Sequence, residues 1–159
     1  MKIRIISVGK VKEKYLLAGI NEYKKRLSTF TKLEILELED EKIPDKASAM
    51  QEEQIKEKEG KRILEKIRDD EYVILLDLHG KEIDSIELSK HLEQCMVNGK
   101  SVITFVIGGS LGLSKSVIAR SDFRLCFSKL TFTHQMIKLF LLEQIYRSYK
   151  IMNHQTYHK

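Results

Sequence analysis

The chain has 159 residues, of which 28 are basic and 23 acidic, so its formal net charge is +5. This length suits one domain whose core needs no disulfide or metal to hold it together. Two cysteines and one proline exclude a disulfide framework and a proline-rich chain, and no apolar run reaches the roughly 18 residues of a membrane span. We therefore expect a soluble, cytoplasmic protein with a single domain over residues 1–159.

The basic residues are concentrated at the two ends of the chain. Residues 112–159 hold eight basic and two acidic side chains, and residues 1–39 hold nine basic and five acidic ones. The stretch between them has an acidic excess. Clustered positive charge attracts phosphate backbones, although a solvated basic face is an equally good interpretation before any motif is considered.

The first half of the chain alternates apolar strands with helical patterns. We expect strands over residues 3–8 and 32–39 and helices over residues 12–27 and 47–68. The second strand alternates apolar and charged residues, which favours a place near the edge of a sheet. Gly60 is a point where the second helix could break or bend.

The second half continues the alternation. We expect strands over residues 72–78, 101–107 and 123–127 and helices over residues 83–97, 114–119 and 134–149. The first two of these strands are almost wholly apolar, as is typical of strands covered on both faces. Strands that alternate with helices around buried central strands predict an α/β domain built on a mostly parallel sheet flanked by helices.

The last helix is apolar on most of its sides. At about 100° per residue, Met136, Leu139 and Leu142 point in three different directions. Such a helix must be covered on more than one side. We expect a second copy of the chain to cover one side, which makes the protein a homodimer; the alternative is a helix wedged deep in the core of a monomer.

Three strands end in segments that suit a ligand. These segments are residues 76–81, 108–112 and 127–132. In open α/β sheets ligands bind outside the carboxyl ends of strands, and glycines let the backbone approach a ligand closely. The spacing Gly-Gly-x-x-Gly at 108–112 matches neither a dinucleotide fingerprint nor a P-loop. Taken singly, each segment is equally well explained as a turn, and Thr133 as the N-cap of the last helix.

The tail over residues 153–159 combines Tyr157 with two histidines and a terminal lysine. An aromatic ring among polar groups suits stacking on an unstacked base and contact with phosphate, whereas a frayed terminus is the plainer interpretation. The five histidines show no spacing with carboxylates that would hold a metal, so we expect none. No serine or cysteine lies in a nucleophile pattern.

Four segments together carry a resemblance to a known family. They are Leu-Asp-Leu-His-Gly-Lys (76–81), Phe-Val-Ile-Gly-Gly-Ser-Leu-Gly-Leu-Ser (105–114), Leu-Cys-Phe-Ser-Lys-Leu-Thr-Phe-Thr-His-Gln (125–135), and Glu-Gln-Ile-Tyr-Arg (143–147) with the Tyr-His-Lys tail (157–159). In this order, and over essentially the whole chain, they resemble the RlmH family of the SPOUT superfamily. Its members are bacterial enzymes that methylate N3 of a pseudouridine in 23S ribosomal RNA.

The resemblance implies a fold, a cofactor and a set of partners. The C-terminal part of the sheet would form a deep trefoil knot, and the methyl donor would be S-adenosylmethionine. The residues implied to hold it are Leu76, Gly108, Phe127, Ser128, Lys129, Leu130, Thr131 and Phe132. The family acts as a homodimer on the assembled 70S ribosome, with no metal and no membrane.

The resemblance also implies a composite catalytic site that uses the tail of the partner subunit. Tyr157 would pack against or orient the base, and His158 would be a proton acceptor or a hydrogen-bond partner. Arg147 and Lys159 would contact phosphate or the uracil carbonyls. The chain departs from the family at Thr156, where a proline usually precedes the tail tyrosine.

Two alternatives stay open. A non-catalytic module that binds RNA or the ribosome would use the same fold but would not bind S-adenosylmethionine. A SPOUT methyltransferase with another RNA target, such as a 2′-hydroxyl of transfer RNA, usually carries an N-terminal asparagine–arginine signature. Residues 1–30 show nothing like it beyond an isolated Asn21.

Overall fold

The computed structural model describes residues 1–159 and contains one five-stranded sheet. Its strands are β1 (Lys2–Val8), β2 (Lys32–Leu38), β3 (Tyr72–Glu82), β4 (Val102–Ile107) and β5 (Phe123–Cys126), in the order β2-β1-β4-β3-β5. Every pairing is parallel. The expected α/β fold on a parallel sheet is confirmed, and β2 lies at an edge as its alternating pattern predicts.

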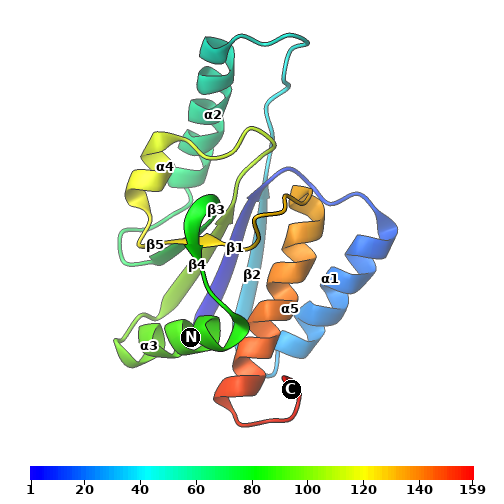
Figure 1. The fold of residues 1–159 in the computed structure, drawn as a ribbon, viewed down its shortest axis with the longest axis vertical. Coiled ribbons are helices and arrows are strands. Elements are labelled where there is room, and N and C mark those ends of the chain that lie inside the picture. Colours follow the sequence, from blue (N-terminus) through cyan, green and yellow to red (C-terminus); the bar gives the residue numbers. More distant parts are fainter.

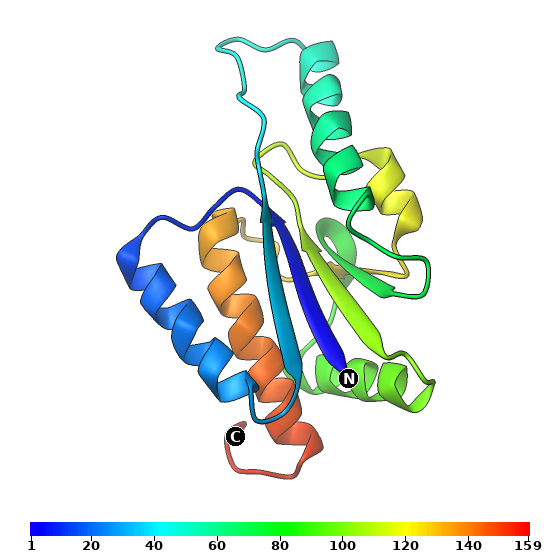
Figure 2. The same cartoon turned by 180° about the vertical axis from the view of Figure 1, so that it is seen from behind.

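Helices cover both faces of the sheet (Figures 1 and 2). They are α1 (Lys14–Leu27), α2 (Ala49–Leu64), α3 (Ser85–Val97), α4 (Lys115–Arg120) and α5 (His134–Met152). The larger core packs α1, α3 and α5 against one face, and the smaller core packs α2 and α4 against the other. None of these helices combines the length and the apolar character that crossing a bilayer requires.

Gly60 does not interrupt α2, which is shorter than predicted because it ends at Leu64. A Cβ atom on Gly60 would collide with the Ser114 side chain and lie 3.2 Å from Val117 Cγ2. The glycine therefore permits α2 to approach α4 closely, and this contact outweighs the low helix propensity of the residue.

Helix α5 packs against the sheet between α1 and α3. Its side chains Ile137, Leu141, Leu142 and Ile145 are buried in the larger core. Elements of the same chain therefore cover most of the apolar sides of α5. The apolar character of this helix does not by itself require a second copy of the chain, which removes that argument for a homodimer.

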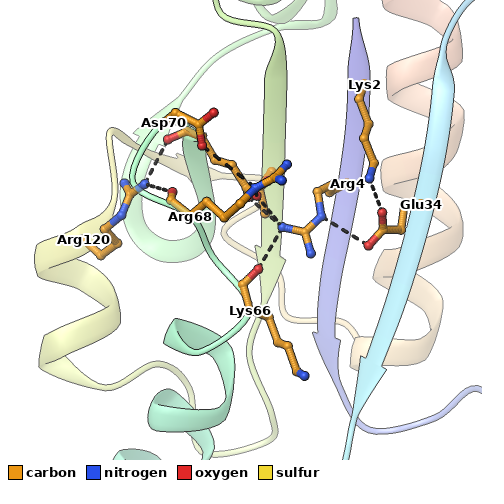
Figure 3. Close-up of polar contacts among 9 residues, drawn as sticks. Lys2, Arg4, Glu34, Lys66, Arg68, Asp70 and Arg120 are labelled. Atoms are coloured by element: carbon orange, nitrogen blue, oxygen red, sulfur yellow. Dashed lines mark hydrogen bonds and ion pairs between the residues drawn. The ribbon is translucent and has the colours of Figure 1, made fainter.

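A buried ion pair joins Arg4 to Glu71, the residue before β3. Figure 3 shows Arg4 with its polar neighbours. Arg4 in β1 donates from Nη1 to both carboxylate oxygens of Glu71 at 2.7 Å, and to the Lys66 carbonyl at 2.9 Å. The Thr104 hydroxyl and Arg68 Nε also donate to Glu71, at 2.6 and 3.3 Å. Burial alone would raise the pKa of Glu71, but the hydrogen bonds from Thr104 and Arg4 lower it.

Replacing this carboxylate should destabilise the fold. Glu71→Gln leaves the buried Arg4 guanidinium with only the partly exposed Glu34 as a charged partner. Breaking a buried ion pair typically costs about 3–5 kcal/mol. Because the folded state lowers the pKa of Glu71, its stabilising effect is complete above the unfolded value of about 4.3 and is lost as the pH falls through the folded value. The free energy of unfolding, measured in urea, should therefore be much lower for Glu71→Gln than for the wild-type protein at pH 7. The difference should shrink on acidification.

Asp69→Asn is the matched control, because Asp69 is exposed and makes no hydrogen bond or ion pair through its side chain. A Glu71→Gln variant that is no less stable at pH 7 than this control would contradict the account.

Candidate functional site

The three loop segments predicted from the sequence follow neighbouring strands. β4, β3 and β5 are adjacent in the sheet, and Gly108, Leu76 and Phe127 lie where their regular pairing ends. Parallel strands end at one edge of a sheet, where α/β proteins bind ligands. The fold therefore brings the three segments to a common edge.

Strand β3 makes a detour after Leu76. Leu76 and Lys81 both pair with Leu125 of β5, so residues 77–80 leave the ladder and the strand then resumes as far as Glu82. The sequence prediction that this strand ends at residue 78 is wrong. Pairing with β5, a strand more than 40 residues away, extends β3 beyond its local turn signal.

Two contacts fix this detour against β5. A Cβ atom on Gly80 would lie 2.5 Å from the carbonyl oxygen of Arg124, so only glycine fits there. The Asp77 carboxylate accepts from Arg124 Nε at 2.8 Å and from the amide of His79 at 2.9 Å. Asp77 therefore has a structural role in holding the loop.

The 108–112 loop is a tight turn that rests on helix α2. The Gly112 amide donates to the Gly109 carbonyl at 3.0 Å, and Gly112 has a φ of +95°. A Cβ atom on Gly109 would lie 3.0 Å from Glu59 Oε1. Glu59 is buried, which raises the pKa of its carboxyl, and it accepts a hydrogen bond only from the amide of Glu41. A buried side chain thus supports this loop from behind.

The 127–132 loop exposes apolar side chains at the same edge. Leu130 is 73% exposed and Phe132 is 44% exposed, while Leu78 in the β3 detour is 54% exposed. The Ser128 hydroxyl accepts from the Leu130 amide at 3.0 Å, which shapes the turn. Apolar side chains left in contact with water beside glycine loops are suited to hold an aromatic base such as adenine.

Helix α5 begins where this loop ends. The Thr133 hydroxyl accepts from the Met136 amide at 3.3 Å, so the predicted N-cap is confirmed. One turn later the buried Lys138 ammonium donates to Glu37 Oε2 at 2.7 Å. Burial would raise the pKa of Glu37, but the hydrogen bonds from Lys138 and the Val11 amide lower it. The start of α5 is thus held against the edge strand.

The tail after α5 folds back onto that helix. The Tyr157 hydroxyl donates to Glu143 Oε1 at 3.0 Å, and Arg147 Nη2 donates to the same oxygen at 2.6 Å. Arg147 Cζ lies 4.7 Å from the centroid of the Tyr157 ring, and its Nη1 lies 3.2 Å from His158 Nδ1. The structure therefore brings Arg147, Tyr157 and His158 together in what we call the tail cluster, with Glu143 as its fourth member.

Glu143 is a site residue that the sequence reasoning missed. One acidic residue on an apolar helix gives little indication of a role. Its spacing from Arg147 is i,i+4, the spacing of an ion pair on one helix face. That spacing was the available signal.

The tail cluster and the three loops lie at different ends of α5. The 127–132 loop leads into its first residue, whereas the tail cluster joins Glu143 and Arg147 to residues that follow its last residue. Figure 1 shows the end of the chain beside the last turns of α5. Arg147 lies 13 residues after His134, which corresponds to about 20 Å along the helix. The two predicted groups of site residues therefore do not meet within one chain.

No cluster of three or more His, Cys, Asp or Glu side chains is arranged to hold a metal ion.

The fold and the loops define an α/β protein with a parallel sheet. Loops suited to a ligand follow the carboxyl ends of three of its strands. Within that class, the chain belongs to the SPOUT methyltransferase family. The family model described as "Predicted SPOUT methyltransferase" matches residues 1–158.

Several relatives match the chain over its full length and theirs. It is 61% identical to Ribosomal RNA large subunit methyltransferase H 1 of Clostridium perfringens (strain SM101). It is 57% and 55% identical to proteins named Ribosomal RNA large subunit methyltransferase H from Clostridium tetani and Enterococcus faecalis. Each comparison covers 159 residues and 100% of both chains. The resemblance to the RlmH family is confirmed.

Proposed function

We propose that the protein is an S-adenosylmethionine-dependent methyltransferase that modifies N3 of a pseudouridine in 23S ribosomal RNA, on the assembled ribosome in the cytoplasm. The observation that carries the proposal is identity of 55–61% with relatives named large-subunit ribosomal RNA methyltransferases, over the whole of each chain. The part of the chain that these comparisons cover includes both the loops and the tail. We treat residues 1–159 as a single domain with this one activity.

In this proposal the three loops hold the methyl donor. Leu76, Gly108 and the segment Phe127–Phe132 would surround it, with the exposed Leu130 and Phe132 side chains against the adenine. The bound cofactor supplies a methyl group on a sulfonium, which is already electrophilic. The protein must therefore position the base so that N3 attacks the methyl carbon, while the N3 proton passes to solvent water. Membership of the SPOUT family, matched over residues 1–158, supports a trefoil knot in this part of the chain.

The separation of loops and tail supports a homodimer with composite sites. If two copies pack with their α5 helices antiparallel, the tail cluster of each copy comes beside the loops of the other. The positive charge of residues 112–159 would then be gathered from two chains at each site, where it attracts the RNA backbone.

The Arg147 contact restricts the role of His158. A guanidinium has only donors, so His158 Nδ1 must accept the hydrogen bond across 3.2 Å. The neutral ring then carries its proton on Nε2. We therefore assign His158 as a hydrogen-bond donor to a carbonyl oxygen of the target base, in preference to a proton acceptor at Nε2.

Tyr157 and Arg147 have roles that need no change of protonation. Burial raises the pKa of the Tyr157 phenol, as do its hydrogen bonds with Tyr23 and Glu143, so it stays neutral and orients the base. The hydrogen bond to Glu143 raises the pKa of Arg147. Its permanent charge suits contact with phosphate or with the uracil carbonyls.

Deleting residues 154–159 should abolish methylation and leave donor binding intact. The deletion removes Tyr157 and His158 but no part of the loops, which lie at the other end of α5. Methyl transfer would be measured on 70S ribosomes that lack the modification, with mass mapping of the 23S RNA. Donor affinity would be measured by calorimetry.

The same two measurements separate the alternatives. A full-length chain that does not bind S-adenosylmethionine would favour a non-catalytic ribosome-binding module, and methylation at another position would favour a different RNA target. Full activity of the truncated chain would contradict the role given to the tail.

Substitution at His158 tests its role as a donor. His158→Gln keeps an N–H group near the position of Nε2, whereas His158→Ala removes it. Loss of one hydrogen bond should lower kcat of the alanine variant by about tenfold, and the glutamine variant should recover most of that loss. If His158 is a proton acceptor, both variants will be equally impaired.

A further inference from the structure

The tail tyrosine is held by a residue from the opposite end of the chain. The hydroxyl oxygens of Tyr23, in α1, and Tyr157 lie 3.4 Å apart. Tyr157 donates its single hydroxyl hydrogen to Glu143 at 3.0 Å. The hydrogen between the two tyrosines must therefore come from Tyr23. The bonds run in one direction, from Tyr23 through Tyr157 to the Glu143 carboxylate.

Tyr23 is itself fixed by neighbouring side chains. The Tyr146 ring makes edge contacts with both tyrosines, with centroids 5.9 Å from Tyr23 and 5.0 Å from Tyr157. The guanidinium carbon of Arg26, almost one turn further along α1, lies 5.2 Å from the centroid of the Tyr23 ring. Edge-to-face rings and cation–π contacts both favour one defined arrangement. The Tyr23 hydroxyl is thus presented to the tail by a packed cluster.

We propose that Tyr23 is a positioning residue that fixes Tyr157, and through it the tail, before any substrate binds. Its consequence for catalysis rests on the proposed function, whereas its effect on the tail does not. Thr156 lacks the ring that would fix the backbone before Tyr157, so the conformation of the tail depends on such side-chain contacts. A tail ordered in advance avoids the entropic cost of ordering it on the ribosome.

The experiment removes one hydroxyl from α1. Tyr23→Phe keeps the ring, and Tyr15→Phe is the matched control because Tyr15 is 68% exposed on the same helix and makes no hydrogen bond through its hydroxyl. We expect faster hydrogen exchange of the amides of residues 154–159 in Tyr23→Phe only. We also expect kcat on ribosomes to fall about three- to tenfold, as for one neutral hydrogen bond, with unchanged affinity for S-adenosylmethionine.

A double variant distinguishes positioning from general stability. If Tyr23 acts through the Tyr157 hydroxyl, Tyr23→Phe will cause no further loss of kcat in a Tyr157→Phe background. Three results would each overturn the proposal. They are additive losses of kcat in the double variant, unchanged amide exchange in the tail of Tyr23→Phe, and a fall in its affinity for S-adenosylmethionine as large as its fall in kcat. If the wild-type protein methylates no ribosome, the proposed function fails, and amide exchange still decides the role of Tyr23.

Discussion

Helix α5 connects the two halves of the candidate site and also keeps them apart. Its buried apolar residues fix it against the sheet, and the Lys138–Glu37 ion pair holds its first turns beside the edge strand. Because the helix is rigid and about 28 Å long, the loops before it and the tail after it have fixed positions in different places. A site that uses both must be built from two chains.

Local patterns in the sequence were sufficient for much of the fold. The almost wholly apolar run of β4 predicts a fully buried strand, the alternation in β2 predicts an edge strand, and Thr133 marks the start of α5. The return of β3 to its ladder at Lys81 could not be predicted, because it depends on pairing with β5, which no local pattern encodes. The Arg4–Glu71 ion pair likewise joins segments 67 residues apart.

The candidate site could likewise be predicted only in part from the sequence. Its loops could be proposed from glycines and apolar residues at strand ends, and the tail residues from the family resemblance. The bonds among them could not, since Tyr23 and Tyr157 are 134 positions apart. Those bonds narrow the chemistry. In the proposed function, Arg147 would make His158 a donor and Glu143 would receive the Tyr157 hydrogen, so the tail would orient a base and not remove its proton.

The most direct test of the account is to divide the site between two different subunits. One subunit would lack residues 154–159, and the other would carry Gly108→Trp, with its unfolding temperature checked. Each variant homodimer should be inactive on ribosomes. In the proposed dimer, the purified heterodimer would have one site with intact loops and an intact partner tail, so it should show about half the wild-type activity per dimer. A heterodimer as inactive as its parents would contradict a site shared between two chains.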